Sequence, residues 1–107
     1  MGHYLIQVAY TSEAWDSMVK NPQDRVQAVR PVVESLGGSM KEAFLAFGEY
    51  DVVTICEFPD NVNSAAFSMA VSAGGACKAI KTTPLMTTTE TVDAMTKAGQ
   101  AGYRPPE

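Results

Sequence analysis

Histidine, cysteine and tryptophan are scarce in this sequence, which has one His, two Cys and one Trp in 107 residues. Cys56 and Cys77 stand far apart without a C-x-x-C spacing, and His3 alone cannot complete a zinc site with them. A phosphate-binding glycine loop is absent, and so is a nucleophile with a base at usable spacing. We therefore expect no metal and no cofactor, and we interpret both cysteines as small buried apolar residues.

Long apolar runs and clustered positive charge are also missing. Apolar residues make up 46% of the chain, but no uninterrupted run approaches the roughly 20 residues that a membrane span needs. The net charge is −4 and the basic residues are scattered, so we expect neither nucleic acid nor a membrane as a partner. The N-terminus enters a strand pattern by His3 without the features of a signal peptide. These features favour a cytoplasmic protein whose residues 1–107 form one domain.

The periodicity of apolar residues divides the chain into strands and helices. Alternation predicts a strand, and recurrence at every third or fourth residue predicts a helix. Pro31 lies inside the second helical segment and predicts a kink or a local break there. The expected strands are 3–10, 39–47, 52–58 and 77–83, and the expected helices are 13–20, 23–36, 62–73 and 87–98.

The third helical segment is made almost wholly of small and apolar residues. Its apolar residues recur at helical spacing, and we expect this mostly alanine stripe to pack against the sheet. The stripe consists of Val62, Ala65, Ala66, Met69, Ala70 and Ala73.

The order of these segments is the split β-α-β pattern of an α+β fold. In this pattern a four-stranded antiparallel sheet carries its helices on one face. Only Gly48-Glu49-Tyr50-Asp51 joins the second and third strands, too few residues for a parallel crossover, so these strands form a hairpin. Because the strands are apolar on both sides, we expect the bare face to be covered by a second copy of the chain.

Several short segments of this sequence together resemble the GYD family of small bacterial proteins. The most specific is the Gly-x-Tyr-Asp turn with the strand that follows it, and the resemblance runs from about Tyr4 to the end of the chain. The segments are Tyr4-Leu5-Ile6-Gln7-Val8 with Tyr10-Thr11, Asn21-Pro22-Gln23-Asp24-Arg25, Leu36-Gly37-Gly38, Phe47-Gly48-Glu49-Tyr50-Asp51-Val52-Val53 and Lys81-Thr82-Thr83-Pro84.

This resemblance implies a ferredoxin-like fold of the dimeric α+β-barrel kind, in which two sheets pack face to face. Families that resemble it in architecture include muconolactone isomerases, quinol-forming monooxygenases, haem-degrading enzymes and ligand-sensing regulators. The GYD family brings no settled activity to carry over, and fold alone does not choose among those functions.

Four residues are candidates for a ligand-binding site. Tyr50 and Asp51 could orient a small ligand by stacking and a hydrogen bond, or Asp51 could accept backbone amides while Tyr50 covers a core edge. His3 is the imidazole available for proton transfer or ligand contact, or simply part of a frayed terminus. Trp15 could line a pocket between helices and sheet, or be an ordinary core tryptophan.

Three polar residues in the strands could meet inside the dimer. Gln7, Glu42 and Thr54 are expected on one sheet face, where they would need partners across the two-fold axis or a bound ligand. The assignment depends on strand register, because a slip of one residue reverses it.

Two functions remain open at this point. The first is a homodimeric module that binds a small molecule or serves in assembly, with higher oligomers and the role of the tail Tyr103–Glu107 left open. For this non-catalytic module we expect side chains such as Trp15 and Phe67 to fill the cleft, leaving no cavity of ligand size. The alternative is a cofactor-independent enzyme of the isomerase or monooxygenase type, with a pocket near Trp15, Tyr50 and His3.

Overall fold

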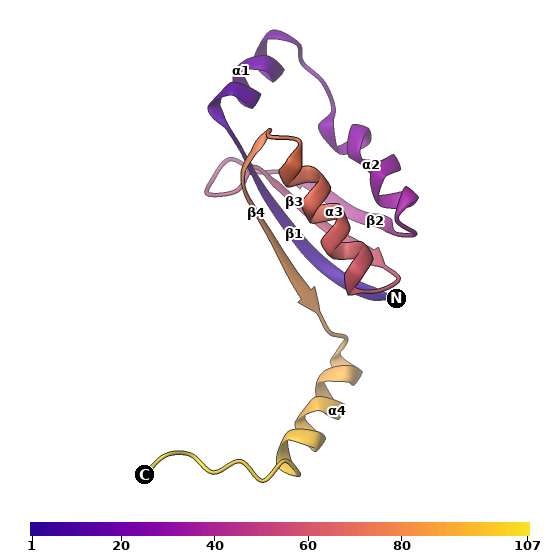
Figure 1. Ribbon diagram of the computed structural model, residues 1–107, viewed down its shortest axis with the longest axis vertical. Helices are drawn as coiled ribbons and strands as arrows, with labels where there is room; N and C mark the ends of the chain where they lie inside the picture. Colours follow the sequence, from indigo (N-terminus) through magenta and orange to yellow (C-terminus); the bar gives the residue numbers. More distant parts are fainter.

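An antiparallel sheet of four strands, in the order β2-β3-β1-β4, forms the centre of the molecule. The computed structural model describes residues 1–107, and Figure 1 shows their path. The strands are β1 (Gly2–Tyr10), β2 (Ser39–Leu45), β3 (Val52–Phe58) and β4 (Cys77–Leu85), and the helices are α1 (Ser12–Lys20), α2 (Arg25–Ser35), α3 (Asn61–Ala73) and α4 (Thr88–Gly99). The α+β fold and the β2–β3 hairpin predicted from the sequence are confirmed.

Most element boundaries follow from local chemistry that the sequence displays. The side chains of Thr11, Asp24, Asp60 and Thr87 cap the four helices by accepting an amide of the first turn. β4 runs two residues beyond its expected end and includes Pro84, which an edge strand tolerates because its outer amides need no partner.

α2 is held close to the sheet by its C-terminal glycines. Gly37 has a φ of 77°, and the amide of Gly38 donates to the carbonyl of Val33. A Cβ at Gly38 would lie 2.5 Å from the carbonyl oxygen of Glu57, so the approach requires glycine. The helix continues through Pro31, so the local break that the sequence offered as one outcome does not occur.

α2 and α3 cover the same face of the sheet, and the core lies between them and the strands (Figure 1). The strands place alternate residues on this covered face. The fully buried side chains there are Ile6, Val33, Cys56 and Phe58, with Tyr4, Val8, Met40, Val52 and Phe67 beside them.

The expectation for the packing side of α3 is wrong. Its buried residues are Ser64 and Phe67, with Val71 partly buried against the core. Most of the stripe predicted to pack lies on the outward side, where Val62 is 76% and Met69 69% exposed. Ala66 is half-buried, and Ala70 borders the space between the helix and the sheet. The stripe is more continuously apolar than the buried side, which explains why periodicity selected the wrong side.

The other face of the sheet is uncovered in the single chain. It carries Leu5, Val53 and Ile55, all half-buried, and Phe44, which is 66% exposed. We call these four residues the bare face.

The three polar strand residues do not share one face. Gln7 pairs with Val53 and Glu42 with Ile55, so both belong to the side of the bare face. Thr54 pairs with Ile6 and is buried on the covered face, where its hydroxyl donates to the Glu42 carbonyl at 2.6 Å. The bulge between Met40 and Glu42 explains the position of Glu42, because an extra residue reverses the alternation in β2. Gln7 and Thr54 lie on opposite faces for another reason, the regular register of β1 with β3.

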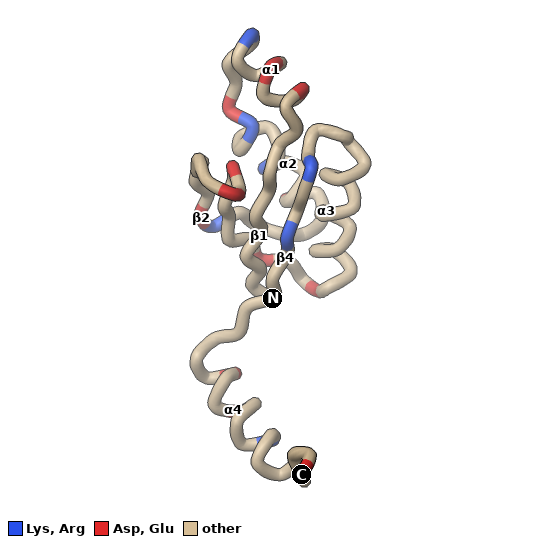
Figure 2. The backbone as a smooth tube through the Cα atoms, turned by 90° about the vertical axis from the view of Figure 1, so that its left-hand side faces the viewer, with Lys and Arg blue, Asp and Glu red and all other residues tan.

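α4 stands apart from this body. It follows β4 after Met86 and Thr87 and extends beyond the end of the sheet, as both Figure 1 and Figure 2 show. None of its residues is buried. The radius of gyration is consequently 17.2 Å, against about 13 Å for a compact chain of this length.

The helices are all too short or too polar to cross a lipid bilayer.

Candidate functional site

Asp51 connects the β2–β3 turn to β1 and α1. Its amide donates to the Val8 carbonyl at 2.8 Å, which continues the pairing of β3 with β1. Its carboxylate oxygen Oδ2 accepts from the Tyr10 amide at 2.8 Å and from the indole Nε1 of Trp15 at 3.3 Å. Asp51 therefore accepts a backbone amide, as one of the two interpretations expected, but the amide belongs to a neighbouring strand.

Trp15 lies at the edge of the body and not in the core. It is 38% exposed, and its ring meets that of Tyr10 edge-on with 5.5 Å between centroids. Tyr50 is half-buried in the turn beside Asp51. Trp15, Tyr50 and Asp51 thus belong to one end of the sheet, where β1 leads into α1.

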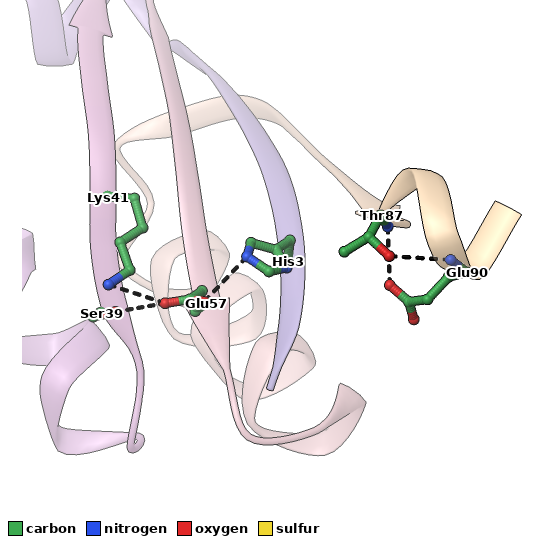
Figure 3. A network of polar contacts seen from close by, with 6 residues as sticks. All are labelled: His3, Ser39, Lys41, Glu57, Thr87 and Glu90. Carbon is green, nitrogen blue, oxygen red and sulfur yellow. Dashed lines mark hydrogen bonds and ion pairs between the residues drawn. The ribbon is translucent and has the colours of Figure 1, made fainter.

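His3 belongs to the opposite end of β1, on the side of the bare face. Its Nε2 lies 3.1 Å from Oε1 of Glu57, and the ammonium of Lys41 lies 3.0 Å from Oε2 (Figure 3). Ser39 donates to the same carboxylate at 3.4 Å. The hydrogen bond from Lys41, helped by His3 and Ser39, holds the pKa of Glu57 below its usual range. His3 therefore contacts Glu57 at the rim of the bare face, away from the other three candidates.

A cavity of about 280 Å³ lies between α2, α3 and the covered face of the sheet. Of the 17 residues that line it, 14 are hydrophobic. Phe67 lines this space without filling it, and Trp15 does not line it, so the expectation of a cleft filled by these side chains is wrong. The apolar lining includes Ile6, Val8, Val26, Val29, Val32, Met40, Ala43, Val52 and Val71.

Apart from Thr54 in the middle of β3, the polar groups of the cavity gather where β1 and β4 meet the start of α2. Tyr10 pairs with Cys77 across the two strands, and Arg25 begins α2 beside them. Burial is the main cause that raises the pKa of Tyr10, with Cys77 and Asp51 adding to it and Arg25 opposing it. Burial likewise raises the pKa of the Cys77 thiol. Tyr10 and Cys77 are therefore neutral near pH 7, and Arg25 carries the charge of this end.

Cys56 has a structural role on the same face. It is fully buried, its Sγ lies 3.6 Å from the Thr54 hydroxyl, and burial raises the pKa of its thiol. Both cysteines are free, and Cys77 is only half-buried. The interpretation of the cysteines as buried apolar residues thus holds for Cys56, whereas Cys77 borders the cavity.

None of the four candidate residues lines the cavity, but three are near its polar end. Asp51 and Trp15 both contact Tyr10, which lines the cavity, and Tyr50 adjoins Asp51. Sequence reasoning did not select Tyr10, Arg25 and Cys77 for the ligand site, because the β1–β4 register brings Tyr10 to Cys77 and the packing of α2 on the sheet brings Arg25 to the same end. The one available signal was the tyrosine that ends the first strand directly before a helix cap.

No group of three or more His, Cys, Asp or Glu side chains is placed so that it could hold a metal ion.

Comparisons with known proteins agree with this architecture. The family model described as GYD domain matches residues 4–95. Among solved structures, the chain is similar to the crystal structure of FFRP-DM1, with a TM-score of 0.50 and 15% identity over 80% of this chain and 100% of that one. At this identity the similarity shows the fold alone, which is ferredoxin-like. The comparison with curated proteins gives no match.

Proposed function

This chain belongs to the GYD domain family, and we propose that it is a homodimeric module that binds a small apolar molecule bearing one acidic group. The observation that carries the proposal is the apolar cavity of about 280 Å³ with Arg25 at one end. Such a volume is at the lower limit of ligand pockets, so the ligand would have roughly ten to fifteen non-hydrogen atoms.

The chemistry of the cavity lining supports this ligand class. Its hydrophobic residues favour an alkyl chain or an aromatic ring, because burial of apolar surface contributes about 25 cal/mol per Å². The Arg25 guanidinium favours a carboxylate or similar anion, and the neutral Tyr10 hydroxyl is a further hydrogen-bond donor. A neutral hydroxyl and a neutral thiol are poor nucleophiles and bases, so binding has more support than an isomerase or oxygenase activity.

The candidate residues take supporting roles in this proposal. Trp15 and Asp51 would fix the backbone and ring of Tyr10, and with Tyr50 they would form the rim where the acidic group enters. His3 would act at the subunit interface, through its contact with Glu57.

The bare face supports the homodimer. Leu5, Phe44, Val53 and Ile55 form an apolar surface across three neighbouring strands, and such surfaces on soluble proteins usually mark interfaces. A second copy offers an equal and self-complementary surface under two-fold symmetry. We further place the protein in the cytoplasm, because free thiols persist in a reducing compartment.

Calorimetric titration with octanoate tests the ligand proposal, and 1-octanol serves as its uncharged match. We expect octanoate to bind about tenfold more tightly than octanol, since a charge-assisted hydrogen bond contributes about 1.5 kcal/mol. Val71→Phe, which fills the cavity, should abolish binding of both compounds. Arg25→Gln should lower octanoate affinity to that of octanol, whereas Arg104→Gln in the tail should change nothing.

Two results would contradict the proposal. One is the absence of binding by the unaltered protein, and the other is octanoate binding that survives Val71→Phe. Circular dichroism of each variant checks that the fold is retained.

A further inference from the structure

We propose that α4 of one copy packs along the outward side of α3 of a second copy. This contact between copies is additional to the proposed pairing of the bare faces, and it does not depend on ligand binding. It rests on two apolar surfaces of the same chain that nothing covers.

The first surface is one side of α4. On a helical projection Val92, Met95 and Ala98 lie on one side, while Glu90, Asp93 and Lys97 lie on the opposite side. This is the pattern of a helix that packs by its apolar side, yet Met95 is 66% exposed and no residue of α4 is buried. A helix of 12 residues is marginally stable alone in water, even with the capping box of Thr87 and Glu90 (Figure 3).

The second surface is the outward side of α3. The helix contains no charged residue between Asn61 and Ala73, and Figure 2 shows it free of blue and red along its length. Its exposed stripe includes Val62, Ala65 and Met69. A solvent-facing helix normally carries charges on its outer side, so this side of α3 has the composition of a covered surface.

A groove beside this stripe adds an independent observation. It lies between α3 and β4, has a volume of about 380 Å³, and is lined by Ala65, Met69, Ile80 and Pro84 among others. Ser64 also lines it and is 2% exposed, with a hydroxyl that has no hydrogen-bond partner. Buried polar groups without a partner are rare in folded proteins, so the groove has room and chemistry for a further element.

The two surfaces match one another but do not meet within one chain. α4 has 12 residues and α3 has 13, so their lengths are about 18 and 20 Å. Only Met86 and Thr87 separate β4 from α4, and α4 leads away from the sheet while α3 lies along it (Figures 1 and 2). In a second copy, α4 would find the outward side of α3 that its own chain does not offer it. Such an exchange of an element between two copies is domain swapping.

Mixed crosslinking tests the pairing directly. One variant carries Val92→Cys and another Met69→Cys, each with Cys77→Ser so that the half-buried thiol does not compete. The two are mixed and treated with a short bismaleimide, and the products are identified by mass. We expect a mixed dimer joined between residues 92 and 69, several-fold more abundant than the product of Val92→Cys with Val19→Cys on exposed α1.

The proposal is overturned if the mixed product is no more abundant than that control. It is also overturned if a chain with both new cysteines is crosslinked only within itself, at the mass of a monomer. Failure of the bare-face dimer would leave the mixed crosslink intact, so the two outcomes are distinguishable.

Hydrogen exchange of α4 gives a second test that requires no crosslink. In the unaltered protein we expect the amides of 88–99 to exchange about tenfold or more slowly than in Met95→Lys. Asp93→Asn changes the charge by the same amount on the opposite side of the helix and should leave the slow exchange unchanged. Fast exchange of α4 in the unaltered protein would refute the docking of this helix.

Discussion

The two faces of the sheet are built by the same strands but differ in what covers them. Along β3, Val52, Thr54, Cys56 and Phe58 are buried under α2 and α3, whereas the residues between them are only half-buried. The covered face has its hydrophobic partners within the chain and encloses the cavity. The bare face has apolar residues without such partners, and the proposed homodimer would supply them.

The difference between the two faces shows that the role of a strand residue depends on the face to which its side chain points, and this face alternates from one residue to the next. Residues one position apart on β1 or β3 belong either to the core and the cavity or to the proposed interface. A substitution on the covered face should therefore act on folding or ligand binding. The same substitution on the bare face should act on association.

The largest expected effect comes from truncating a phenylalanine on the covered face. Phe58 is 0% exposed and packs against Tyr4 and Phe67, so Phe58→Ala should lower the free energy of unfolding by about 3–5 kcal/mol. Phe44→Ala on the bare face should cost the single chain less than about 1 kcal/mol. Urea unfolding at low protein concentration compares them, and equal losses would show that the two faces do not differ as described.

An intermediate effect is expected at the turn that joins the two central strands. Asp51→Ala removes the acceptor for the Tyr10 amide and the Trp15 indole and should cost about 1–2 kcal/mol. Glu49→Ala, two residues away and exposed, should stay within about 0.5 kcal/mol. Thermal unfolding measures both, and octanoate titration of the same variants separates a structural role of Asp51 from a role in binding.

The smallest effect concerns the rim of the bare face and depends on pH. Because Lys41, His3 and Ser39 lower the pKa of Glu57, its ionised form stabilises the folded state at neutral pH. This contribution is fully present above pH 4.5, the ordinary pKa of glutamate. It disappears as the pH falls through the lowered pKa that Glu57 has in the folded state. In Glu57→Gln, the free energy of unfolding should therefore fall slightly less on acidification than it does in the unaltered protein.

The matched control for this change is Glu34→Gln, on the exposed side of α2. Urea midpoints measured between pH 7 and pH 3 should show this smaller fall for Glu57→Gln alone. If the urea midpoints of both variants fell with pH as those of the unaltered protein do, Glu57 would have no stabilising role at the rim of the bare face.

Much of the fold could be predicted because its signals are local. Each local signal indicates a single kind of secondary structure or boundary. Examples are the helix cap Asp60, the capping box of Thr87 and Glu90, the glycines after α2 and the alternation in β3. The orientation of α3 could not be predicted in the same way. Its exposed side is more continuously apolar than its buried side, and a single sequence does not say whether a surface faces its own sheet or another chain.

The candidate site was predicted only in part, for a related reason. Asp51 and Trp15 were selected as unusual residues near a strand end, and the structure brings them together through Tyr10. Cys77 meets Tyr10 through the β1–β4 register, and Arg25 reaches the same end of the cavity through the packing of α2 over the sheet. Such nonlocal pairing carries no periodic signal in the sequence.

The central claim is that the bare face contacts a second copy while the covered face does not. Isotope-filtered NMR on a mixture of labelled and unlabelled chains tests it, because only contacts between copies give a signal. We predict intermolecular signals from the methyl groups of Leu5, Val53 and Ile55, and none from those of Ile6 and Val8. The claim would be contradicted if slow tumbling showed that the chains were associated and yet Leu5, Val53 and Ile55 gave no intermolecular signals.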